Sequence, residues 1–200
     1  MNRTIATAII SSLIALVAPA LSENAQSAVD IRDADVAGLR LGMSYQEAVG
    51  VFARRYGQTW EQVDAGVTKS ENKLLGTNQA QWIAMTNGTE TLSVNFATRI
   101  PLNADNPLVV DTITYQLPWS PKNEADMANA VISKYGRQSN APNSDPMQWC
   151  SEPQLESTEI CTVVGRHLLL SGTKLQLVDF TFSKAELELR NESRALKPTF

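Results

Sequence analysis

The sequence predicts an α+β protein of two tandem αβββ units, with antiparallel strands and two helices packed on one side of them. The first observation is a capped helix pattern that occurs twice, opening at Ser44 and, 79 residues later, at Asn123. Each copy ends at a Tyr-Gly pair. The second observation is that segments of alternating apolar and polar residues follow each copy, as in half-buried strands. The third is a tryptophan within each set of segments, Trp82 and Trp149.

The first helix pattern carries clear boundary signals. Ser44 is a good N-cap, and Glu47 three residues later completes a capping box. Gly57 follows the last apolar position, as glycines that adopt positive φ at helix ends do.

The second helix pattern repeats this arrangement. We expect Asn123 to cap it and Gly136 to end it, with Pro121 still outside the helix. Each helix has an apolar stripe that must be buried on a second layer.

The strands that would supply this layer are indicated by alternation. In the first half they are residues 79–86, 92–96 and 111–117; in the second half they are residues 149–150, 160–170 and 174–182. The Asn87-Gly88 pair between the first two is a strong signal for a hairpin turn.

The domain boundaries follow from these segments. We expect a signal peptide over residues 1–20, a loose leader over 21–35 and one duplicated domain over 36–183. The first repeat covers about 36–117 and the second about 118–183, followed by a charged helix or tail over 184–200. Neither half alone would bury much core, so the two sheets should join or pack closely.

The N-terminus indicates export. Arg3 is followed by an uncharged, mostly apolar stretch, and small residues at Ala18 and Ala20 suit a signal peptidase. Cleavage as late as residue 27 fits as well, and an uncleaved anchor is the alternative. The serines and threonines of the stretch make it a weak span of about 20 residues. Because no cysteine follows this stretch, we expect no lipid anchor. After cleavage we expect no membrane span either, so the protein should be periplasmic or secreted.

Two cysteines, Cys150 and Cys161, suit an oxidising compartment. A disulfide between them would close a hairpin-sized loop and stabilise the protein by about 3 kcal/mol in the chain-entropy model. The alternative, a redox or metal pair, lacks a Cys-x-x-Cys spacing and a neighbouring histidine.

Composition and motifs argue against catalysis. The net charge of −4 comes without a basic stripe, which disfavours nucleic acid as a partner. His167 is the single histidine, and the chain has no Gly-x-Ser-x-Gly turn and no phosphate-binding loop. We therefore predict a non-enzyme with no catalytic residue, no metal site and no cofactor.

What remains is a binding surface. An uncharged, hydrogen-bonding strand face carries Thr112, Thr114 and Gln116, and Trp82 and Trp149 are candidate anchors. Two alternatives stay open: a solvated antiparallel face has the same pattern, and both tryptophans can instead fill two equivalent core positions.

Leu39 to Ala48 reads Leu-Arg-Leu-Gly-Met-Ser-Tyr-Gln-Glu-Ala, which resembles the opening motif of the small outer-membrane-assembly lipoprotein family. The repeated helix and strands are similar to the β-lactamase inhibitor protein architecture, in which two such units form one curved sheet that grips a partner. The resemblance implies a periplasmic, non-enzymatic α+β protein and leaves its target open.

Two functional hypotheses follow. The first is an exported protein-binding or inhibitor-like module that meets a cell-envelope protein through one sheet face. The alternative is a small-molecule-binding protein or hydrolase with a pocket between helices and sheet, which would need polar groups near His167. The disulfide, His167 and the loop over residues 139–146 occur only in the second half, so a specific partner is expected there first.

Overall fold

A computed structural model describes residues 30–151 and 165–195, with side chains up to residue 192. The predicted signal peptide, Cys161 and residues 160–164 of one predicted strand lie outside the described residues.

The described chain forms one large sheet, one small sheet and helices before, between and after the strands. In chain order the elements are η1 (Ile31–Asp33), β1 (Asp35–Val36), β2 (Leu39–Arg40), α1 (Tyr45–Tyr56), α2 (Trp60–Ala65), β3 (Thr68–Asn72), β4 (Thr77–Thr86), β5 (Thr91–Thr98), β6 (Leu108–Gln116), α3 (Pro121–Tyr135), β7 (Met147–Cys150), β8 (Arg166–Ser171), β9 (Lys174–Asp179) and α4 (Phe180–Ala195).

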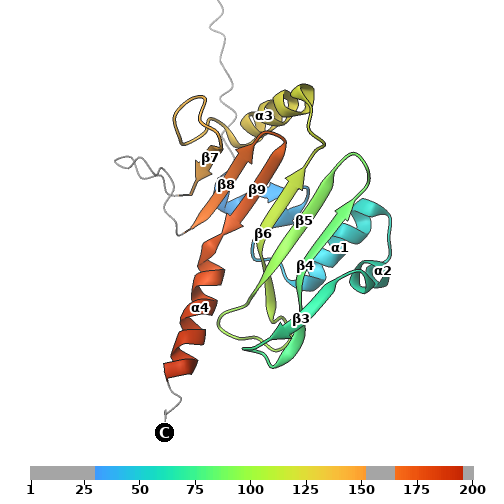
Figure 1. The fold of residues 1–200 in the computed structure, drawn as a ribbon, viewed down its shortest axis with the longest axis vertical. Coiled ribbons are helices and arrows are strands. Elements are labelled where there is room, and N and C mark those ends of the chain that lie inside the picture. Colours follow the sequence, from blue (N-terminus) through green and yellow to red (C-terminus); the bar gives the residue numbers. More distant parts are fainter. Residues whose placement is uncertain (1–29, 152–164, 196–200) are drawn as a thin grey trace, which may run out of the picture.

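The large sheet is antiparallel throughout, with the strand order β3-β4-β5-β6-β9-β8-β7. Helices α1 and α3 and the β1–β2 hairpin cover its rear face as drawn in Figure 1. The α+β prediction with helices packed on one side is therefore confirmed. The two halves of the chain join into one continuous sheet where β6 pairs with β9.

A row of apolar side chains crosses six strands and forms the centre of the core. Direct cross-strand partners connect them in the order Ile83, Val94, Ile113, Leu177, Leu168 and Trp149. Each is at most 4% exposed. Side chains alternate between the two faces of a strand. This row therefore shows that the same face of the sheet, from β4 to β7, packs against the helices.

Helix α1 begins and ends as predicted. The Ser44 side chain accepts a hydrogen bond from Glu47 N–H, and the Glu47 carboxylate accepts one from Ser44 N–H, which completes the capping box. Gly57 adopts a left-handed conformation at φ 64°. The buried face of the helix presents Val49 and Phe52 to the core.

Helix α3 begins three residues earlier than predicted. Ser120, not Asn123, is its N-cap, and Pro121 is its first helical residue. Proline suits this position because the N–H it lacks would have no helical partner there and its φ is already helical. Asn123 instead donates from its side chain to the Pro118 carbonyl.

The sequence does not predict η1 or the β1–β2 hairpin and, beyond α1, it misses two further elements of the first half. The edge strand β3 has exposed side chains over residues 68–71 and no apolar alternation. Helix α2 is only six residues long, although Thr59 and Gln62 form a second capping box. The first half therefore contains four strands in the large sheet and the second half three.

Two boundaries were also wrong. The predicted leader ends too late, because Ile31 and Ala34 are buried in the main core. The last strand ends at Asp179 rather than at residue 182. The Asp179 carboxylate accepts from Thr181 N–H, a bond typical of a helix N-terminus, so α4 begins there.

Helix α4 continues from β9 and packs against the lower ends of β5 and β6 (Figure 1). Glu186 accepts a hydrogen bond from Thr98 N–H at 2.9 Å. Ser183 donates to the Asp111 carboxylate at 3.0 Å. A register shift at Asn95 and Phe96 separates this end of the two strands from their regular part.

The register predicts opposite stability effects at neighbouring positions of β6. Ile113→Ala should lower the free energy of unfolding by about 2–5 kcal/mol, because it leaves a cavity in the central row. Thr114→Ala, on the other face, should change it by less than about 1 kcal/mol. Urea unfolding monitored by circular dichroism measures both, and equal losses would contradict the assignment of the faces.

Candidate functional site

The front face of the large sheet is the main candidate surface. Direct cross-strand pairing places its residues in three rows. The first holds Trp82, Asn95, Thr112, Val178, His167 and Cys150; the second Ala84, Ser93, Thr114, Gln176, Leu169 and Gln148; the third Thr86, Thr91, Gln116, Lys174 and Ser171. The uncharged side chains of Thr112, Thr114 and Gln116 are thus brought onto one face, as the sequence predicted.

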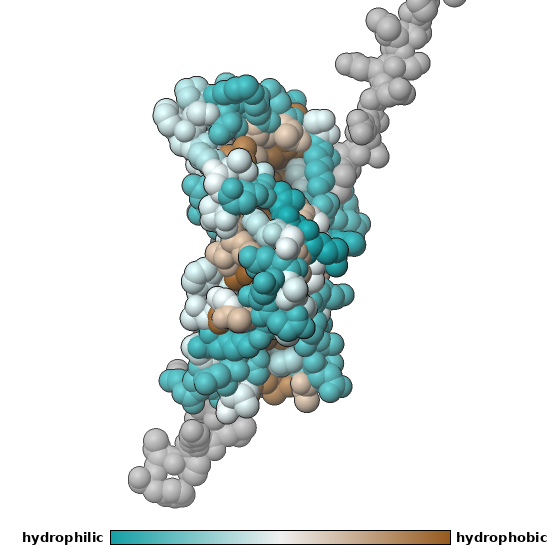
Figure 2. All heavy atoms as spheres, turned by 90° about the vertical axis from the view of Figure 1, so that its right-hand side faces the viewer, coloured by the Kyte–Doolittle hydropathy of each residue, from teal (hydrophilic) through white to brown (hydrophobic). Residues whose placement is uncertain are grey.

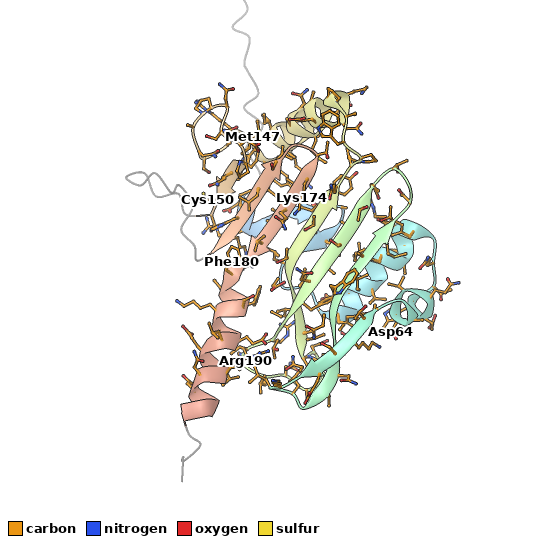
Figure 3. All side chains as sticks on the ribbon, viewed as in Figure 1. Asp64, Met147, Cys150, Lys174, Phe180 and Arg190 are labelled. Atoms are coloured by element: carbon orange, nitrogen blue, oxygen red, sulfur yellow. The ribbon has the colours of Figure 1, made fainter. Side chains whose placement is uncertain are left out.

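The three rows carry little charge, whereas the edge strand β3 beside Trp82 holds Lys69 and Glu71. Lys174 is the single charged residue in the three rows, and Figure 3 shows it at the upper end of β9, away from the middle of the sheet. Within the rows, Thr86 and Thr91 share a hydroxyl hydrogen bond of 2.9 Å, and Gln176 donates to Thr114 at 3.4 Å. The face therefore offers hydrogen-bonding groups with an aromatic side chain among them.

The two candidate tryptophans lie on opposite sides of the sheet. Trp82 is 47% exposed on the front face, whereas Trp149 is 2% exposed in the central core row. The Trp149 indole donates to the Gly136 carbonyl at 2.9 Å, just beyond α3. The alternative that both tryptophans fill equivalent core positions is wrong for Trp82, because Ile83 next to it takes the inward position. Trp149 is too deeply buried to contact a partner.

The start of α4 covers the front face at the lower ends of β8 and β9. Phe180, at the start of α4, meets the His167 ring edge-to-face with centroids 5.9 Å apart. His167 is buried there, as is its partner Val178. Figure 3 shows Phe180 where β9 gives way to the helix. The accessible part of the face therefore lies over β4, β5, β6 and the upper part of β9.

The loop over residues 139–146 has a structural role. Ser139 N–H donates to Gln148 O at 2.7 Å, and the side chains of Asn140 and Ser139 accept from the N–H groups of Gln148 and Cys150. These bonds occupy the outer edge of β7, which would otherwise be open to pairing. Cys150 ends this strand, and its predicted partner Cys161 is outside the described residues, so the disulfide stays a prediction.

The second candidate surface is a hollow on the helix side of the sheet, between α1 and α3. Its volume is about 300 Å³. The cross-strand pair Tyr115 and Leu175 lines it where the two halves of the sheet join. Val36, Met127 and Val131 add apolar walls, and the charged lining residues are Asp35, Arg55 and Lys134.

The charged groups beside this hollow form two ion pairs. Arg55 donates from Nε and Nη2 to the two oxygens of Glu90, both at 2.7 Å, and Tyr115 donates to the same carboxylate at 2.8 Å. These bonds, the Arg55 bonds first, hold the pKa of Glu90 below its usual range. Burial, together with the bond to Glu90, raises the pKa of Tyr115 to about 12. The Lys134 ammonium group donates to the backbone carbonyl and to both carboxylate oxygens of Asp35; the shortest distance, to Oδ2, is 2.8 Å.

Neither surface includes a cluster of metal-ligand side chains among the described residues. Over residues 30–151 and 165–195, no three His, Cys, Asp or Glu side chains are grouped so that they could hold a metal ion. His167 is buried against Phe180 and is not among the residues that line the α1–α3 hollow.

Comparisons of the chain with protein-family models, with curated proteins and with solved structures find no match. Among the helices of the described part of the chain, none is long and apolar enough to cross a membrane. Figure 2 shows a side of the molecule that is mostly hydrophilic, with small separate hydrophobic patches.

The Glu90 cluster predicts a pH dependence of stability. Because the folded-state pKa of Glu90 is lowered, its stabilisation is present above about pH 4.3, the ordinary glutamate value, and is lost as the pH falls through the lower folded value. Glu90→Gln should cost about 1–3 kcal/mol at pH 7, and the difference from wild type should shrink towards pH 3. Urea unfolding across this range measures it.

Glu71→Gln, on the exposed edge strand, is the matched control and should differ little from wild type at any pH. A loss in Glu90→Gln that stays constant from pH 7 to pH 3 would show that the carboxylate charge is not what stabilises this cluster.

Proposed function

We propose that this chain is an exported, non-enzymatic module that binds a protein of the cell envelope through the front face of its sheet, in the manner of an inhibitor or adaptor. The observation that carries the proposal is an exposed tryptophan, Trp82, at the end of one of three rows of side chains over β4, β5 and β6 that include no charged residue.

An antiparallel face that only meets water normally includes charged side chains, since these make up a large share of soluble surfaces. Interface centres differ from such surfaces because they are depleted of charge and enriched in aromatic residues. The rows over β4, β5 and β6 share the depletion of charge and hold one exposed aromatic residue, Trp82. Threonine, serine, asparagine and glutamine there can pair with a partner without the cost of desolvating a charge.

The shape of the surface favours a macromolecule over a small molecule. The face is built on the regular strands of one sheet, so its side chains are held in fixed positions before binding. Such preorganisation reduces the entropy lost on association. Helix α4 bounds the face at its lower end and gives the surface a defined limit.

An arginine at the centre of the face should abolish partner capture. In Thr114→Arg a long cation would replace a half-buried hydroxyl and would lose hydration against the uncharged surface of a partner. Binding should fall at least about tenfold, which is about 1.4 kcal/mol, while the unfolding midpoint stays close to wild type. A photo-crosslinker at Gln116, followed by mass spectrometry of envelope extracts, identifies the partner, and titration measures its affinity.

The matched control is Asn129→Arg, which adds the same charge to an exposed position of α3 on the other side of the sheet. This variant should keep full affinity. Trp82→Ala should weaken binding as well, by the loss of an aromatic anchor. Unchanged affinity in both Thr114→Arg and Trp82→Ala would exclude the front face.

Export is part of the same proposal. We expect a mature chain that starts at residue 21, or as late as residue 28, and that carries a disulfide between Cys150 and Cys161. The intact mass of the secreted or periplasmic protein, measured with and without reduction and alkylation, tests both features. A chain that retains residue 1, or two alkylated cysteines without prior reduction, would contradict them.

A further inference from the structure

The hollow between α1 and α3 lies on the opposite side of the sheet from the proposed protein-binding face. Both helices contribute to its lining, α1 with Arg55 and α3 with Met127 and Val131. Helix α1 contacts β4 and β6, whereas α3 supplies Met127 and Val131 to the part of the core beyond it. The cross-strand pair Tyr115 and Leu175 remains between them as a partly apolar floor.

The size of this hollow is that of a small-ligand site. Its volume of about 300 Å³ lies at the lower end of the range found for ligand pockets. Three different parts of the chain build its sides, namely β1 with Val36, α3 with Val131, and α1 with Arg55. The lining is mainly apolar with a few polar groups, the combination that fixes the orientation of a ligand with an apolar body.

The polar groups indicate the charge of the ligand. Arg55 uses Nε and Nη2 for Glu90, which leaves its Nη1 outside this ion pair. A guanidinium that is fixed on one side presents its remaining donors in a geometry that suits a carboxylate. Lys134 is a second cation in the lining, and Asp35 is the one anion among the described residues that line the hollow.

We propose that the α1–α3 pocket binds a small amphipathic carboxylate, with its apolar body on the Tyr115–Leu175 floor and its carboxylate at the remaining donors of Arg55. A single carboxylate fits better than a doubly charged anion, because Arg55 and Lys134 are each paired with a carboxylate and only the Arg55 donors outside its ion pair are offered to a ligand. A cationic amphiphile would meet the Arg55 guanidinium without a hydrogen-bond acceptor to offer it.

A series of unbranched carboxylates tests the apolar part of the proposal. Isothermal titration of the purified protein with butanoate, hexanoate, octanoate and decanoate, all below micelle-forming concentrations, should show affinity that rises about fourfold per added CH₂ until the pocket is full. Decan-1-ol and decyltrimethylammonium should bind at least tenfold more weakly than decanoate. Equal binding of decyltrimethylammonium and decanoate would overturn the assignment of a carboxylate.

Two variants locate the site. Ala130 lines the pocket on an exposed part of α3, so Ala130→Trp should fill the space without removing a core contact and reduce decanoate affinity at least tenfold. Ala125→Trp places the same side chain at another exposed position of α3, which is not among the lining residues, and should bind decanoate as wild type does. Unchanged binding in Ala130→Trp would overturn the proposal, as would the absence of binding to wild type.

Arg55→Gln separates the carboxylate contact from the apolar contact. It should reduce decanoate affinity about tenfold and leave decan-1-ol affinity unchanged, whereas Arg54→Gln, its exposed neighbour on α1, should change neither. The unfolding midpoint of each variant is measured first, because Glu90 loses its partner in Arg55→Gln. A parallel loss of decanol binding in a folded Arg55→Gln protein would contradict a direct role in carboxylate recognition.

Discussion

The structure depends on one row of buried side chains that crosses the sheet from Ile83 to Trp149. Each member is the direct partner of the next, so the register of every strand from β4 to β7 is tied to the same constraint. A shift of one residue in any strand would move its apolar side chains to the other face. The row also determines the second surface, because each inward position has outward neighbours.

The two proposed sites are consequences of this division. On the front face, the outward neighbours are mostly uncharged and include the exposed ring of Trp82. On the rear face, the helices cover the row but leave a gap above Tyr115 and Leu175, where the two halves of the chain meet. The Glu90 carboxylate beside the gap holds both Arg55 and Tyr115 in place. A partner on one face and a small ligand on the other would therefore contact opposite sides of the same strands.

Sequence reasoning succeeded where a local pattern is decisive. The capping box at Ser44 and the glycine at residue 57 define α1, and alternation revealed β4, β5 and β6 to within a few residues. It failed where the pattern is weak or ambiguous. Strand β3 has no buried stripe because it lies at the sheet edge. At the start of α3, Asn123 has the side chain of a good cap, but the helix begins at Pro121 behind Ser120, because proline is favoured at the first helical position.

The α+β class, the antiparallel strands and the uncharged set of Thr112, Thr114 and Gln116 follow from local sequence patterns, because strand periodicity is a local property. The outward position of Trp82 and the burial of Trp149 depend instead on tertiary packing, since either face of a strand can lie against the helices. The continuity of the sheet through β6 and β9 is likewise a tertiary feature. The arrangement of Arg55, Glu90 and Tyr115 around one pocket depends on packing between distant segments, which no spacing along the chain encodes.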